Sequence, residues 1–172
     1  MKKLYALLLA GVMAAALALP AMAAPSPVAD SIASGSTVTT TASSVSTAAL
    51  SQETAAEVVK VTSNREVMNN LNVPTTAHLA AVLEVSYSGT IPAGGVQVPF
   101  NVGGLAAKGD TVYILHRQPN APYTWEVVGQ AVLGDDLTVT GTFTSFSPVA
   151  FMVQKSTDAA ATQVRAPRTG EY

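Results

Sequence analysis

Apolar and polar residues alternate in six short runs between residues 77 and 154, and this period of two constrains the fold more than any other feature of the chain. It is the period of a β-strand that buries one face. Clusters of Gly, Pro, Asn and Asp separate the runs, and such clusters are typical of turns. Because no long helical pattern lies between the runs, the sequence predicts a mainly β, antiparallel sandwich or barrel of about six to seven strands. The predicted strands are residues 79–87, 96–102, 111–116, 124–128, 137–143 and 147–153.

Other segments flank this predicted β domain, which covers residues 77–154. Residues 24–50 are rich in Ser, Thr and Ala, with few large apolar side chains, and are expected to form a flexible linker. Residues 51–73 predict a short N-terminal helical segment with Ser51 as N-cap and a second start, with capping-box spacing, at Ser63. Its apolar stripe favours docking on the sheet over binding a partner. Residues 155–172 lose the alternation and are expected to form a disordered tail.

The N-terminus has the three regions of a secretory signal peptide. Lys2 and Lys3 precede an uncharged apolar run over residues 4–19, and Ala21-Met22-Ala23 has the small-x-small pattern that signal peptidase cleaves. The run is shorter than the roughly 20 residues that span a bilayer, which favours a cleaved peptide, residues 1–23, over an uncleaved anchor. We therefore expect a bacterial protein that is secreted or associated with the cell surface, without membrane insertion after cleavage.

Charge and cysteine content exclude several partners and chemistries. Loss of the two N-terminal lysines takes the formal charge from −2 to −4, and no basic cluster remains, which argues against a nucleic-acid partner. The chain contains no cysteine, so it has no disulfide, no thiolate catalysis and no iron–sulfur cluster. We expect no cofactor.

Four sequence motifs lie in the predicted strands and their turns. They are Val98-Pro99-Phe100-Asn101-Val102, Lys108-Gly109-Asp110-Thr111-Val112-Tyr113-Ile114-Leu115-His116, Trp125-Glu126-Val127-Val128 and Phe143-Thr144-Ser145-Phe146-Ser147-Pro148-Val149-Ala150. With these motifs, residues 79–153 resemble a small domain of unknown function that recurs in secreted and surface proteins of anaerobic Gram-positive bacteria. The resemblance implies an immunoglobulin-like β-sandwich that serves as an accessory module of extracellular proteins. It implies no catalytic role.

The C-terminal run Ala166-Pro167-Arg168-Thr169-Gly170 is similar to the Leu-Pro-x-Thr-Gly motif that sortases join to the cell wall. Ala166 replaces the leading Leu, and no apolar tail follows the motif. These departures favour a chance match or a truncated signal over a working sorting signal.

The pattern of the polar residues does not point to a catalytic or metal site. His78 and His116 are the two histidines, and the acids available as ligands, Asp110, Asp135 and Asp136, are turn residues. Structural or surface roles are therefore favoured over metal binding. No serine lies in a nucleophile-elbow pattern. A histidine within hydrogen-bond reach of both a serine and a carboxylate would instead favour a small extracellular hydrolase.

Tyr113, Tyr123 and Trp125 are the candidate ligand-binding residues. On adjacent strands they could form a flat platform for sugar rings, or one wall of the core, which is the usual place of a single Trp in a β-sandwich. We expect a non-enzymatic structural or interaction module of the cell envelope, with cell-wall polysaccharide or another surface protein as partner. The alternatives are a carbohydrate-binding module that uses these aromatic residues, and the small hydrolase.

Overall fold

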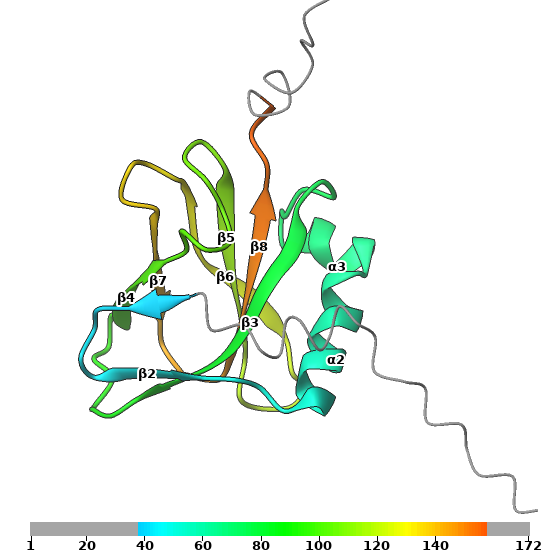
Figure 1. Ribbon diagram of the computed structural model, residues 1–172. Coiled ribbons are helices and arrows are strands. Elements are labelled where there is room, and N and C mark those ends of the chain that lie inside the picture. Colours follow the sequence, from blue (N-terminus) through cyan, green and yellow to red (C-terminus); the bar gives the residue numbers. More distant parts are fainter. Residues whose placement is uncertain (1–37, 158–172) are drawn as a thin grey trace, which may run out of the picture.

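Strands in two antiparallel sheets are the main regular structure of residues 38–157, the part of the chain that the computed structural model describes (Figure 1). In chain order the elements are β1 (Thr39–Thr40), β2 (Val45–Ala48), α2 (Gln52–Thr62), α3 (Arg65–Asn70), β3 (His78–Tyr87), β4 (Val96–Asn101), β5 (Thr111–Arg117), β6 (Trp125–Val132), β7 (Thr138–Phe143) and β8 (Pro148–Gln154). One sheet has the order β1-β4-β7 and the other the order β2-β3-β8-β5-β6. The predicted mainly β, antiparallel fold is confirmed, and the two sheets are arranged as in a β-sandwich.

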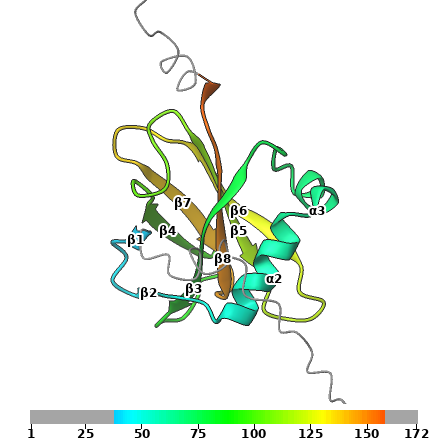
Figure 2. The same ribbon diagram turned by 45° about the vertical axis from the view of Figure 1, so that its right-hand side comes forward.

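The five-stranded sheet is the middle one of three layers. One face packs against the three-stranded sheet through a core that includes Phe100 and Phe151. The other face is covered by α2 and α3 (Figure 2), through a second core that includes Val58, Met68 and Leu115. Because β5 and β8 lie inside this sheet, with both faces covered, they are buried along almost their whole length. This double burial explains why their sequences are nearly continuous apolar runs.

The backbones of β6 and β7 come close together and join the two sheets along one side. A Cβ atom placed on Gly129 of β6 would lie 2.4 Å from the carbonyl oxygen of Thr140 in β7. No side chain fits in that space, so glycine is required for the close approach. The sequence places the end of this strand at residue 128, but β6 continues through Gly129 to Val132.

The predicted linker is wrong for residues 38–50. Val38, Val45 and Leu50 are buried, β1 pairs with β4, and β2 pairs with β3. Thr and Val have high strand propensity, and pairing with a strand that is already packed compensates for the scarcity of large apolar residues. This part of the segment therefore belongs to the sandwich. The remaining predicted linker, residues 24–37, and the predicted signal peptide, residues 1–23, lie outside the described residues.

The N-cap of α2 is the residue that the sequence predicts, whereas the N-cap of α3 is one residue later than predicted. α2 begins after Ser51, whose side chain accepts a hydrogen bond of 3.2 Å from an N–H of the first turn, as the sequence predicts. α3 begins after Asn64 instead of Ser63, because Asn64 Oδ1 accepts the N–H of Glu66 at 3.0 Å. The Ser63 hydroxyl donates to the Val59 carbonyl at the end of α2, at 2.7 Å. Asn64 therefore caps α3 while Ser63 closes α2.

A buried aspartate in the turn before β5 holds the chain at the end of β8. Asp110 is 2 % exposed, and its carboxylate accepts the N–H groups of Ala107 and Ser156, each at 2.9 Å, and the Lys155 ammonium at 2.8 Å. Burial alone would raise the pKa of Asp110, but these hydrogen bonds and the Lys155 charge outweigh burial and hold the pKa below its ordinary value. The predicted disordered tail is therefore wrong for Lys155 and Ser156. Residues 158–172, with the sorting-like motif, lie outside the described part of the chain.

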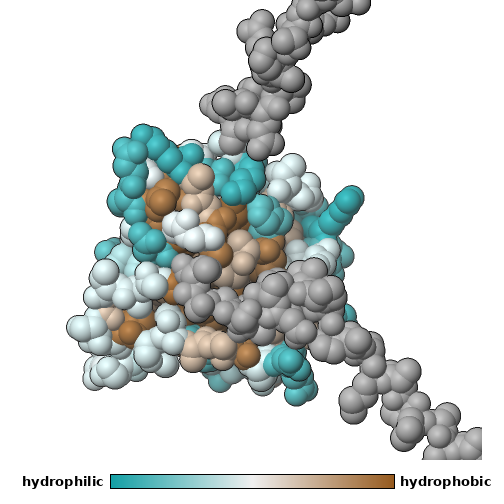
Figure 3. Space-filling model, in the orientation of Figure 1, coloured by the Kyte–Doolittle hydropathy of each residue, from teal (hydrophilic) through white to brown (hydrophobic). Residues whose placement is uncertain are grey.

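Few large hydrophobic side chains are strongly exposed on the described residues. Tyr123 is 55 % exposed and Val132 is 68 % exposed. In the face drawn in Figure 3, hydrophobic residues gather near the middle and hydrophilic residues follow the upper margin. Neither α2 nor α3 is long and apolar enough to cross a membrane, and the described residues contain no other helix that is.

Candidate functional site

His116 lies in a hydrogen-bonded cluster with a serine and a glutamate. Its Nδ1 is 2.9 Å from Oε1 of Glu126, and its Nε2 is 3.1 Å from Oγ of Ser147. This arrangement of serine, histidine and carboxylate is that of a hydrolase triad. His116 thus meets the condition that would favour a hydrolase. His78, exposed at the start of β3, has no such pair of partners among the described residues.

Strand pairing brings the three side chains together. His116 of β5 and Glu126 of β6 are register partners, and on its other side His116 pairs with Val149 of β8. Ser147 comes directly before β8 and so reaches the same end of the sheet. The signal for the His116–Glu126 contact is the short, proline-containing turn between the strands predicted at residues 111–116 and 124–128. No comparable signal in the sequence indicated Ser147, because β8 joins β5 across a separation of about thirty residues.

The proton positions in this cluster differ from those of a catalytic triad. The Ser147 hydroxyl donates to the carbonyl oxygen of Arg117. Since a hydroxyl carries one proton, the Ser147 hydroxyl then has none left to donate to Nε2 of His116. In a triad the serine instead donates to Nε2, which takes its proton. His116 is fully buried and Ser147 is 6 % exposed, so the cluster connects β5, β6 and the start of β8 and presents almost no serine surface to solvent.

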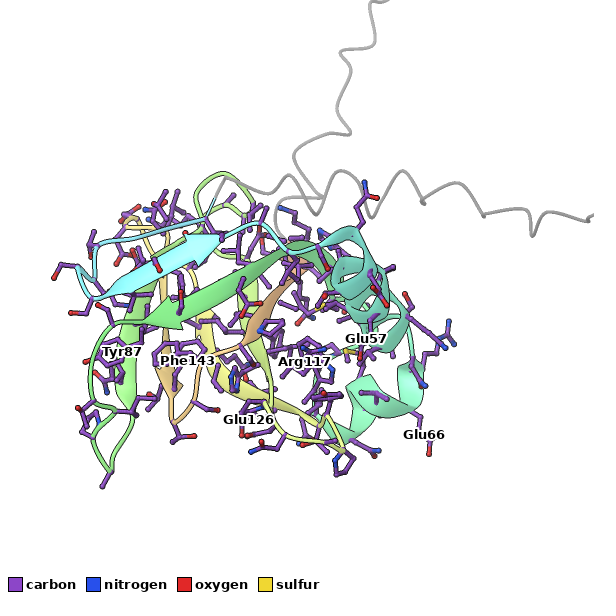
Figure 4. All side chains as sticks on the ribbon, turned by 90° about the horizontal axis from the view of Figure 1, so that it is seen from below. Glu57, Glu66, Tyr87, Arg117, Glu126 and Phe143 are labelled. Atoms are coloured by element: carbon purple, nitrogen blue, oxygen red, sulfur yellow. The ribbon has the colours of Figure 1, made fainter. Side chains whose placement is uncertain are left out.

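Arg117, the next residue along β5, links the sheet to α2. Its Nη1 donates to Oε2 of Glu57 at 3.1 Å, and its guanidinium lies over the Tyr123 ring, 4.8 Å from the ring centroid. Figure 4 shows Arg117 beside α2, near Glu57. Burial raises the pKa of Glu84 on β3, and the Arg117 charge only partly offsets this effect. Arg117 is therefore used to hold strands and helix together.

The structure does not bring the three candidate aromatic residues into one exposed platform. Tyr113 is 5 % exposed beneath the helices, and its hydroxyl donates to Oε1 of Gln154 at 3.2 Å. Trp125 is partly buried against the same core, while Tyr123 is exposed under Arg117. Sugar binding stays a prediction, and the burial of Tyr113 leaves Tyr123 and Trp125 as the members of the set with surface available to a ligand.

The turn acids are engaged in local contacts. Asp135 pairs with Lys108 at 2.7 Å, and Asp136 accepts the N–H of Thr138 at 3.4 Å through its side chain. Across residues 38–157, no three His, Asp or Glu side chains come together as a metal site would require. These contacts are those of turn residues that fix the local backbone.

Comparison of the chain with protein-family models, with curated proteins and with solved structures gives no match.

Proposed function

We propose that this chain is an exported, non-enzymatic structural or interaction module of the cell envelope, built on an immunoglobulin-like β-sandwich. The resemblance to domains of Gram-positive surface proteins and the signal-peptide pattern support the location. The observation that carries the non-enzymatic role is the hydrogen bond from the Ser147 hydroxyl to the Arg117 carbonyl. It occupies the one proton that a catalytic serine passes to its histidine.

A small extracellular hydrolase is the second candidate. It is favoured by the distances of 2.9 Å and 3.1 Å from the two nitrogens of His116 to Glu126 and Ser147. For catalysis, Ser147 would have to turn its proton from the Arg117 carbonyl to Nε2 and become accessible to an ester or amide. Burial of the cluster opposes this movement.

Hydrolysis of p-nitrophenyl butyrate by the purified protein distinguishes the two candidates. We expect the same slow hydrolysis from the wild-type protein and from Ser147→Ala, and no covalent labelling of Ser147 by a fluorophosphonate probe in mass spectrometry. Ser145→Ala is the matched control, because Ser145 is a neighbouring serine whose buried hydroxyl has no hydrogen-bond partner. Hydrolysis that is lost in Ser147→Ala and kept in Ser145→Ala would establish the hydrolase.

Export is tested separately from catalysis. The full chain, expressed in a Gram-positive host with a C-terminal tag, is expected in the medium or the cell-wall fraction, shortened by residues 1–23. Full-length protein retained in the cytoplasm would contradict an envelope role. Pull-down with isolated cell-wall polysaccharide, compared between the wild type and Tyr123→Ala, tests the carbohydrate-binding alternative. Val132→Ala is the control, because it also shortens an exposed apolar side chain.

A further inference from the structure

A cleft of about 350 Å³ opens where the helices meet the start of β3. It lies on the helix-covered face of the five-stranded sheet, whereas His116 packs against Phe143 on the face toward the other sheet. Small-molecule sites have volumes of about 300 to 1,000 Å³. The lining residues are Val59, Thr62, Ser63, Arg65, Met68, Pro74, Thr75, Ala77, His78, Leu79 and Met152.

The inner wall of the cleft is apolar. Met68 and Met152 belong to the core beneath the helices, and Val59 and Leu79 pack against that core. Methionine side chains adapt to ligands of irregular shape because they are unbranched and flexible. This part of the cleft suits a hydrocarbon chain.

The two hydroxyl groups that line the cleft at the end of α2 do not offer protons to an anion. The Thr62 hydroxyl donates to the carbonyl oxygen of Val58 at 2.9 Å, and the Ser63 hydroxyl donates to that of Val59 at 2.7 Å. Two other lining residues have N–H donors in their side chains, the guanidinium of Arg65 and the imidazole ring of His78.

Arg65 makes the polar side of the cleft cationic, and His78 adds a ring N–H donor. Arg65 is permanently charged and carries five N–H donors that match a carboxylate. It forms no ion pair or side-chain hydrogen bond with any residue in the described part of the chain. No aspartate or glutamate lines the cleft. An unpaired arginine beside an apolar wall is complementary to a ligand with one negative charge and one apolar end.

We propose that this cleft binds a small amphipathic carboxylate, with its carboxylate at Arg65 and His78 and its hydrocarbon chain along Met68, Leu79 and Met152. The cleft volume is near the small end of the range for small-molecule sites, which suits a straight-chain acid of about eight carbons. The site is independent of the proposed envelope role and of the His116 cluster, so the two proposals can fail separately.

Isothermal titration calorimetry of the purified protein with octanoate, below its micelle concentration, tests the proposal. 1-Octanol is the uncharged probe of the same chain length. We expect octanoate to bind more tightly than 1-octanol, and Arg65→Gln to weaken octanoate binding about fivefold while leaving 1-octanol unchanged. Lys60→Gln is the matched control, because it removes an exposed positive charge from α2 without touching the cleft.

A second variant tests the apolar part of the cleft without removing charge. Ala77→Leu places a larger side chain among the lining residues and is expected to abolish binding of both octanoate and 1-octanol. Circular dichroism thermal melts of each variant show whether it is folded at the temperature of the titration. Absence of octanoate binding to the wild type, or equal affinity of the wild type and a folded Arg65→Gln, would overturn the proposal.

Discussion

Replacing Asp110 by alanine is expected to lower the free energy of unfolding by about 3 to 4 kcal/mol at pH 7. Asp110 accepts two backbone N–H groups, from Ala107 and Ser156, and a hydrogen bond between a charged acceptor and a buried N–H contributes about 1.5 kcal/mol or more. Lys155 is about half exposed, so its ion pair adds about 0.5 kcal/mol. Urea unfolding followed by far-UV circular dichroism measures the difference. Asp135→Ala is the control, since this exposed turn aspartate also pairs with a lysine and is expected to change stability little.

The effect of Asp110 has a definite sign with pH. Because its pKa is lower in the folded protein than in the unfolded chain, its contribution is fully present above the ordinary aspartate pKa, near 4, and is lost as the pH falls through the lower folded pKa. The stability gap between the wild type and Asp110→Ala should therefore be constant from pH 7 to about pH 5 and shrink at more acidic pH. A gap that stays constant down to pH 2, or an alanine variant as stable as the wild type, would refute this account of the turn.

Three further substitutions test the fold around the candidate site. Ser147→Ala is expected to lower the free energy of unfolding by about 2 kcal/mol in urea titrations, because a buried histidine ring nitrogen and a backbone carbonyl lose their shared partner. Ser145→Ala, which removes no hydrogen bond, should cost clearly less. Gly129→Ala is expected to lower the thermal midpoint by several degrees, since its Cβ would meet a β7 carbonyl at 2.4 Å, whereas Gly94→Ala, with open space around it, should leave the midpoint nearly unchanged. Glu84→Gln should stabilise the fold slightly at pH 7, because the raised pKa shows that ionised Glu84 is disfavoured in the folded protein, and the gain should disappear as Glu84 protonates in acid. Equal stability of the Ser147 and Ser145 variants, equal melting of the two glycine variants, or a Glu84 variant less stable than the wild type would contradict the corresponding contact.

Alternation predicts strands such as β4 and β7, which bury one face, and short apolar runs between turn residues predict β5 and β8, but neither pattern predicts β1 and β2. Those strands are short, and only Val45 among their residues is buried, so the local sequence resembles a linker. Their position is decided by β4 and β3, which offer free edges for pairing. The predicted strand ends too early, at residue 128 of β6, for a related reason. Glycine has a low strand propensity, so Gly129 argues locally against a strand. Its advantage is close contact with β7, which is a tertiary contact that the local sequence does not predict.

The site shows the same division between local and distant information. The short connection from β5 to β6 places Glu126 opposite His116. Consecutive strands with a short turn between them are expected to pair, so the sequence comes close to predicting that these two residues are neighbours. Ser147 and the cleft depend on the position of β8 between β3 and β5, which is a matter of sheet order. The exposure of Trp125 and Tyr113 likewise depends on the helices, whose docking determines which face of β5 and β6 is covered.

The three-layer arrangement also determines where this chain can interact with a ligand. A polar group on β5 or β8 lies between two packed faces, so it must be satisfied from within, as His116 is by Glu126 and Ser147. Groups at the start of β3 and on α3 lie at the margin of the helix layer, where Arg65 and His78 stay exposed. His116, whose partners suggest catalysis, is thus the histidine least able to meet a substrate. His78, which has no serine and carboxylate partners among residues 38–157, borders an open cleft. Binding at the margin of the layers, combined with a closed polar cluster inside, is what we expect of an interaction module whose interior groups serve stability.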